Sequence, residues 1–151
     1  MFKHILVPTD GTELSAESAS AAIRFAKETK ARVTGFYAAV DVRQDRQKFQ
    51  RFLDTERELA SELARRRKEV ADRFLAAIEL EAKEAEVPCQ IKYITTDDPV
   101  HEAIIRAAKE NACDLIFMAT HGPFGIEGIT AGSETKQVLS HCTIPVLVYR
   151  H

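Results

Sequence analysis

The sequence predicts a single doubly wound α/β domain over residues 1–151, in which a five-stranded parallel sheet carries helices on both faces. Three observations favour this fold class. Strand-like and helical patterns alternate along the chain. Most of the predicted strands are continuous apolar runs, which are typical of parallel strands buried on both faces. The length of 151 residues suits one domain, and no internal repeat or flexible linker divides it.

The start of the chain predicts a strand, a helix and a second strand. Residues His4–Pro8 (HILVP) form an apolar run that suits a buried strand, and residues 9–12 (TDGT) follow as a turn. Ser15 is the predicted N-cap of a helix that continues to residue 30. Residues Arg32–Val40 are rich in strand-forming residues, and we expect Gly35 within this strand to allow close packing of a helix.

Residues 41–87 differ from the rest of the chain because they hold 11 Lys/Arg and 12 Asp/Glu. Apolar residues recur among these charges at helical spacing, which predicts an amphipathic helix with a solvated face, long or in two pieces. Arg43, Arg46 and Lys48 are a candidate lid that could bring positive charge to a phosphate site, and the alternative is a solvated helix extension. The basic run at residues 65–68 is diluted by neighbouring carboxylates, which argues against a nucleic-acid patch.

The second half of the chain predicts three more strands and two helices. Pro88 ends the charged helix, and Asp98 and Pro99 suit the N-cap and first position of the next one. Ser133 is the predicted cap of a short helix near the end. The predicted strands are Gln90–Thr95, Asp114–Ala119 and Ile144–Tyr149.

Composition excludes several classes of function. The formal net charge of −2 gives no basic field to attract nucleic acid, and no stretch approaches the roughly 20 apolar residues of a membrane span. The three cysteines are odd in number and lack CxxC spacing, so a disulfide framework or a zinc site is not expected and a cytoplasmic location fits. The histidines show no spacing that suggests a metal site.

A glycine-rich segment is the first candidate for function. Four of the six glycines lie in residues 122–132, between the predicted strand Asp114–Ala119 and the helix that follows. If the first and fourth strands are neighbours, this segment and the turn at residues 9–12 line one crevice beyond the strands' carboxyl ends, where open sheets bind ligands. Glycines allow close backbone approach and helix N–H groups favour an anion, so phosphate is the natural ligand. A simple flexible connection is the alternative.

These segments also carry a resemblance. HILVPTDGTELS, DLIFMATHGPFGIEGITAGSETKQVL and IPVLVYR resemble the universal stress protein family, and the likeness covers essentially the whole chain. The resemblance implies strand order 3-2-1-4-5 and a homodimer paired through the last strand, here Pro145–Tyr149. It also implies a stress-response module that binds an adenine nucleotide.

Some members of that family bind ATP through the motif G-x2-G-x9-G-[S/T]. The corresponding positions here are Ala119, Gly122, Gly132 and Ser133, so three of the four agree. By this resemblance, the backbones of Gly122, Gly132 and Ser133 would hold phosphates, and the Ser133 hydroxyl would be a further donor.

The resemblance assigns two more positions to the nucleotide. Asp10 matches the aspartate expected near the adenosine, and its carboxylate could also hold Mg²⁺ together with phosphate oxygens. Its alternative role is to brace the turn through Gly11 and Thr12. Ala38, late in the second strand, matches the position whose backbone meets the adenine edge.

Three departures from the family pattern favour alternatives to ATP binding. Ala119 adds a methyl group, which is compatible with binding only if its φ stays negative. Pro123 stands where many relatives have a basic residue, and Glu134 places a carboxylate at the helix start, where it would repel a triphosphate. AMP or ADP could therefore suit the site as well as ATP. The rival hypothesis is a stress protein that binds no nucleotide and acts through protein–protein interaction.

An enzyme is the weakest hypothesis from the sequence. No general base, arginine finger or Walker lysine is evident, so any ATP hydrolysis would be slow. His121 could be read as a base, but a loop histidine in contact with solvent or backbone is the simpler interpretation.

Overall fold

The computed structural model describes residues 1–120 and 133–150. All five strands are parallel and form one sheet in the order β3-β2-β1-β4-β5, which confirms the predicted fold class and strand order. The strands are β1 (His4–Pro8), β2 (Arg32–Val40), β3 (Cys89–Thr96), β4 (Leu115–Thr120) and β5 (Val146–Arg150). The helices are α1 (Glu13–Thr29), the 3₁₀ turn η1 (Val42–Gln44), α2 (Arg46–Gln50), α3 (Asp54–Glu84), α4 (Val100–Glu110) and α6 (Ser133–His141).

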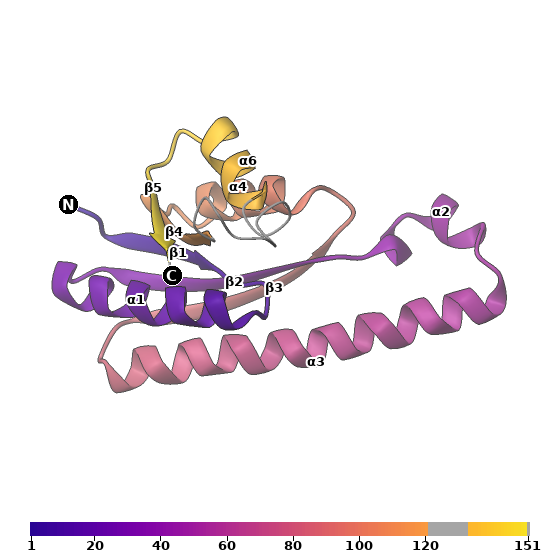
Figure 1. Cartoon of the computed structure of the whole chain (residues 1–151), viewed down its shortest axis with the longest axis horizontal. Coiled ribbons are helices and arrows are strands. Elements are labelled where there is room, and N and C mark those ends of the chain that lie inside the picture. Colours follow the sequence, from indigo (N-terminus) through magenta and orange to yellow (C-terminus); the bar gives the residue numbers. More distant parts are fainter. Residues whose placement is uncertain (121–132, 151) are drawn as a thin grey trace.

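Helices cover both faces of the sheet (Figure 1). α1 and α3 lie on one face, and α4 and α6 lie on the other. Strand β1 serves both layers because successive side chains point to opposite faces. Ile5 and Val7 pack in the core beneath α1 and α3, whereas Leu6 packs in the core beneath α4.

Gly35 has the packing role that the sequence predicts. A Cβ atom on this residue would lie 3.2 Å from Cγ2 of Ile78 on α3 and 3.4 Å from Cγ2 of Ile91 on β3. The first distance is shorter than most side-chain contacts and the second is at the short limit of ordinary van der Waals contact. The absent side chain therefore lets Ile78 of α3 pack closely against the sheet.

Two helix starts differ from the prediction. Thr12, not Ser15, is the N-cap of α1, and the Thr12 hydroxyl accepts a hydrogen bond from the Ser15 backbone N–H. The N-cap of α4 is Pro99 rather than Asp98, and Asp98 forms an ion pair with Arg106. Two cap-type residues stand close together at α1, so local sequence alone does not decide which of them caps the helix.

Two strands begin later than predicted. Asp114 precedes β4, and its carboxylate accepts hydrogen bonds from the backbone N–H groups of Lys3 and His4. β5 begins at Val146 instead of Ile144 and lies at one edge of the sheet. Within the described ranges 1–120 and 133–150, no helix is both long and apolar enough to cross a bilayer.

Candidate functional site

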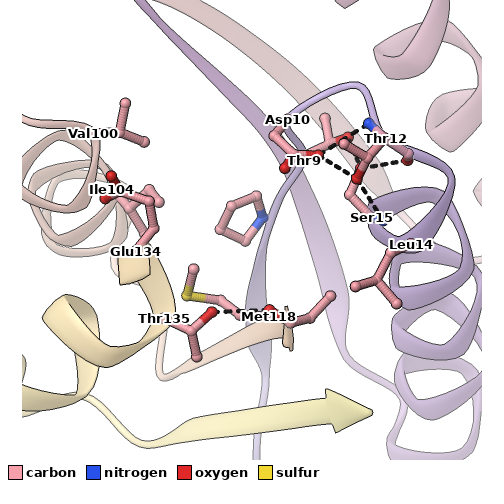
Figure 2. A pocket seen from close by; sticks show the side chains of 12 residues that line it. Thr9, Asp10, Thr12, Leu14, Ser15, Val100, Ile104, Met118, Glu134 and Thr135 are labelled. Atoms are coloured by element: carbon pink, nitrogen blue, oxygen red, sulfur yellow. Dashed lines mark hydrogen bonds between the residues drawn. The ribbon is translucent and has the colours of Figure 1, made fainter. Parts of the chain in front are cut away.

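A cavity opens where the strand order reverses, beyond the carboxyl ends of the neighbouring strands β1 and β4. Figure 2 shows the side chains of the β1–α1 turn on one side of it and those of Val100, Ile104 and Glu134 on the other. The cavity has a volume of about 140 Å³. Its described lining residues are Pro8, Thr9, Asp10, Thr12, Leu14, Ser15, Val100, Ile104, Met118, Ala119, Glu134 and Thr135. The two loops that the sequence places in one crevice therefore follow neighbouring strands at this edge.

The turn between β1 and α1 is held by its own hydroxyl and carboxylate groups (Figure 2). Asp10 Oδ1 accepts hydrogen bonds from the backbone N–H of Thr12 at 3.0 Å and from its hydroxyl at 2.6 Å. The Thr9 and Ser15 hydroxyls lie 2.8 Å apart and are buried. Gly11 adopts φ +80°, a left-handed conformation that suits glycine. Asp10 thus has the bracing role predicted as its alternative, while its side chain also lines the cavity.

The end of β4 forms the floor of the cavity. Ala119 lies within the strand and pairs with Tyr149 of β5, and it is absent from the positive-φ residues of the described chain. The backbone φ of Ala119 therefore stays negative, which is the condition under which its methyl group is compatible with nucleotide binding. Its carbonyl oxygen accepts a hydrogen bond from the buried Thr135 hydroxyl at 2.9 Å, which ties the first turn of α6 to the strand.

Glu134 brings a carboxylate to the wall of the cavity. Its Oε2 lies 3.7 Å from Nδ1 of His101 on α4, an ion pair whenever that imidazole is protonated. This oxygen is buried and has no hydrogen-bond partner in the described part of the chain. The His101 ring lies 5.5 Å from the ring of His141 at the other end of α6. Negative charge therefore stands beside the first turn of α6, as the sequence predicts.

Other predicted site residues lie elsewhere. Ala38, beyond the last residue of β2 that pairs with β1, packs against the core beneath α4 and does not line the cavity. Ser133 is the first residue of α6. Gly122 and Gly132 of the glycine motif, together with Pro123 and His121, lie outside the described residues, so their predicted roles stay predictions.

The structure does not support the predicted lid. Arg43 Nη2 lies 2.6 Å from Oδ2 of Asp41, and Lys48 Nζ lies 3.8 Å from Oδ2 of Asp45. Arg46 begins α2, and none of the three predicted lid residues lines the cavity. Figure 1 shows α2 beyond the end of the sheet, away from α6. The alternative interpretation, a solvated helix extension, describes this segment.

Several lining residues were not predicted from the sequence. Thr9 was predicted only as part of the TDGT turn, and Ser15 only as a helix cap; the position of the turn directly after a strand was the available signal. Thr135 follows the predicted cap Ser133 by two residues and gives no signal of its own. The apolar lining residues look like ordinary core positions in the sequence, and they are Leu14, Val100, Ile104 and Met118.

Comparisons with known proteins agree with this architecture. A model of the universal stress protein family matches residues 1–150. Universal stress protein MJ0531 of Methanocaldococcus jannaschii is 34% identical over 154 residues, which cover 99% of this chain and 83% of that protein. The solved structure of MJ0577 from the same organism has a TM-score of 0.76 at 23% identity, covering 100% of this chain and 97% of that one.

Two further solved structures contain adenine nucleotides. A universal stress protein in complex with cAMP has a TM-score of 0.66 at 16% identity and covers 99% of this chain and 97% of its own. A universal stress protein from Archaeoglobus fulgidus in complex with dAMP has a TM-score of 0.60 at 14% identity, with 98% and 97% covered. At these identities the likeness is one of fold. With the family match over residues 1–150, this chain belongs to the universal stress protein family.

Proposed function

We propose that the cavity between β1 and β4 binds an adenine nucleotide and that this universal stress protein senses adenylate state through it. The observation that carries the proposal is the position of the cavity, at the point where the strand order reverses and where α6 begins. The first N–H groups of a helix favour an anion there. The complexes of two relatives with cAMP and dAMP support the same class of ligand.

The lining divides the cavity into chemically different sides. Leu14, Val100, Ile104 and Met118 supply apolar surface. Hydroxyl groups gather at the β1–α1 turn, as expected of a site that orients a ligand by a few polar groups in an apolar cavity. In this proposal the motif residues Gly122, Gly132 and Ser133 hold phosphate and Asp10 lies near the adenosine. Because Ala38 lies outside the cavity lining, the base extends beyond the cavity to meet the Ala38 backbone.

The number of phosphates is limited by volume and charge. About 140 Å³ is below the roughly 300–1,000 Å³ of typical small-molecule sites, so only part of a nucleotide fits inside the cavity. The Glu134 carboxylate on its wall opposes each added phosphate charge. We therefore expect AMP and ADP to bind at least as well as ATP.

Mg²⁺ would be held mainly by the nucleotide. Asp10 Oδ1 already accepts two hydrogen bonds from Thr12, which leaves Oδ2 as the available oxygen. Over residues 1–120 and 133–150, no group of three His, Cys, Asp or Glu side chains could hold a metal ion. A divalent ion that keeps most of its ligands from phosphate and water suits this arrangement.

We also propose that the protein is a homodimer paired along Pro145–Tyr149. β5 is an edge strand, and its residues Val146, Leu147, Val148 and Tyr149 are only partly buried. An uncovered edge strand presents backbone groups that a second copy can pair with. Light scattering of the purified chain is expected to give at least the mass of two chains.

A second candidate function is a stress protein that binds no nucleotide and acts on partner proteins. Two observations favour it: the Glu134 carboxylate faces the cavity, and the Ala119 carbonyl is already bonded to Thr135. Partner binding would then use another surface of the same fold.

Calorimetric titration with ATP, ADP and AMP, with and without Mg²⁺, separates the two candidates. Leu14→Trp fills the cavity and is expected to abolish binding, as is Gly132→Leu in the motif. Leu80→Trp, an exposed position on α3 outside the cavity, is the matched control and should bind as the wild type does. No binding of any nucleotide at millimolar concentration would overturn the proposed nucleotide function.

A further inference from the structure

A helical arm, defined as residues 42–70, extends beyond the sheet (Figure 1). It comprises η1, α2 and the first 17 residues of α3, and no residue in it is buried. The remainder of α3 packs on the sheet through Ala71, Leu75, Ile78 and Ala82, which are all buried. Burial on α3 therefore begins at Ala71. Just before it, Arg67 and Lys68 still contact Val40 of β2 and Tyr93 of β3 from the solvent side, and the helix before these residues is left uncovered.

The uncovered half keeps the apolar stripe of the covered half. Leu59 and Leu63 lie one helical turn apart, and their exposed fractions are 59% and 50%. Leu53 at the start of the helix is 68% exposed. A solvated helix of this length is marginal on its own, because most helix stability comes from packing an apolar face. The arm thus presents a face that another molecule can cover.

Charge on the arm is divided along its length. Residues 54–62 contain four acidic side chains and one basic one, whereas residues 65–68 are four consecutive basic residues. Arg65 and Arg66 do contact Glu62, at 2.6 and 3.0 Å. Such exposed pairs within one helix contribute little and are screened by salt, so they can exchange partners at small cost. An acidic segment and a basic segment therefore lie end to end on one helix.

We propose that the arm binds the arm of a second copy of this chain in antiparallel orientation. The acidic and basic segments together span residues 54–68. The middle of this span is residue 61, which is also the midpoint between Leu59 and Leu63. A two-fold axis there sets the leucines of one copy against those of the other. It also sets each acidic segment against a basic segment, whereas a parallel pair would set like charges together. This surface shares no residue with the edge strand β5.

Analytical ultracentrifugation of the full chain tests the apolar part of this interface. Leu59→Glu with Leu63→Glu is expected to weaken self-association at least about tenfold and to halve the assembly mass at a fixed concentration. Leu80→Glu is the matched control, because Leu80 is 58% exposed on the same helix but outside the arm. Equal masses for the wild type and the double variant would overturn the proposal, as would an equal loss of mass in the control.

Charge reversal tests the orientation. One variant carries Glu56→Lys, Glu58→Lys and Glu62→Lys, and the other carries Arg65→Glu and Arg66→Glu. Lys68 is kept because its Nζ lies 4.5 Å from the centre of the Tyr93 ring on β3. Arg67 is kept because its guanidinium donates a hydrogen bond to the Val40 carbonyl at 2.8 Å. Each variant alone is expected to lose the arm contact, and an equimolar mixture is expected to restore it. Circular dichroism checks that both remain folded. An unchanged assembly mass for either variant alone refutes the antiparallel orientation, because a parallel pair already sets like charges together and reversal would leave that unchanged. Failure of the mixture to assemble refutes charge pairing between the arms.

Discussion

Replacing Glu134 with glutamine tests the electrostatics of the proposed nucleotide site. The substitution keeps the size of the side chain and removes one negative charge from the cavity wall. Repulsion between the carboxylate and phosphate then disappears, so the affinity for ATP should rise. Adenosine carries no phosphate, and its affinity should stay the same.

The size of the cavity sets the magnitude. A volume of about 140 Å³ corresponds to a sphere of about 3 Å radius, which puts a charge at its centre about 6 Å from a carboxylate on the wall. Two unit charges at about 6 Å repel by about 0.7 kcal/mol in water and about 3 kcal/mol at an effective dielectric constant of 20. The Glu134 side chain is 45% exposed, so screening favours the lower end. We expect ATP affinity to rise about three- to tenfold.

Isothermal titration of the wild type and Glu134→Gln with ATP and adenosine gives the comparison. Glu110→Gln is the matched control, because this exposed glutamate ends α4 and does not line the cavity. The gain for ATP should shrink in high salt, where the Debye length falls to about 3 Å at 1 M. Unchanged ATP affinity, or equal gains for ATP and adenosine, would refute the placement of phosphate near Glu134.

Three further predictions concern stability and reactivity. Gly35→Ala should lower the free energy of unfolding by about 1–3 kcal/mol, because the new methyl group would meet Ile78 at 3.2 Å, and chemical denaturation showing no loss would contradict this packing. Burial lowers the pKa of His4 below its ordinary value of 6.5, so the unfolded chain binds the proton more readily and the free energy of unfolding should fall as pH drops through 6.5. His4→Gln should flatten this pH dependence between pH 7.5 and 5.5. An unchanged dependence of the unfolding free energy on pH would assign the effect to other groups. Burial raises the pKa of the Cys113 thiol to about 11, so a thiol reagent at pH 8 should label it only after denaturation, and rapid labelling of the folded chain would count against its burial.

Much of the fold follows from patterns within short segments. The apolar run His4–Pro8 matches β1 residue for residue, because a strand buried on both faces favours apolar residues. Arg32–Val40 likewise matches β2, which is rich in strand-forming residues. The start of α1 was predicted less well. Thr12 and Ser15 can both cap a helix, and the hydrogen bond that Thr12 accepts decides between them.

The site was predicted in outline and less well in detail. The predicted crevice between the TDGT turn and the glycine-rich segment requires β1 and β4 to be neighbours. The pairing of these two strands is visible only in the assembled sheet. The hydrogen bond from Thr135 to Ala119 and the approach of His101 to Glu134 each join segments that are distant in the sequence. No local pattern encodes such contacts, because they depend on how separate elements pack.

The charged region separates the two kinds of information most clearly. Helical spacing of apolar residues over 41–87 predicts an amphipathic helix, and the sequence alone determines that much, because periodicity is a local property. Only the tertiary structure decides which part of the stripe is covered. The end of β2 lies beside Arg67, whose guanidinium bonds the Val40 carbonyl, and burial on α3 begins at Ala71. Leu75 and Ile78 are therefore buried, while Leu59 and Leu63 on the same helix remain in solvent. Whether a helix residue is buried depends on how far the neighbouring strands extend. The apolar pattern of the helix does not specify where those strands end.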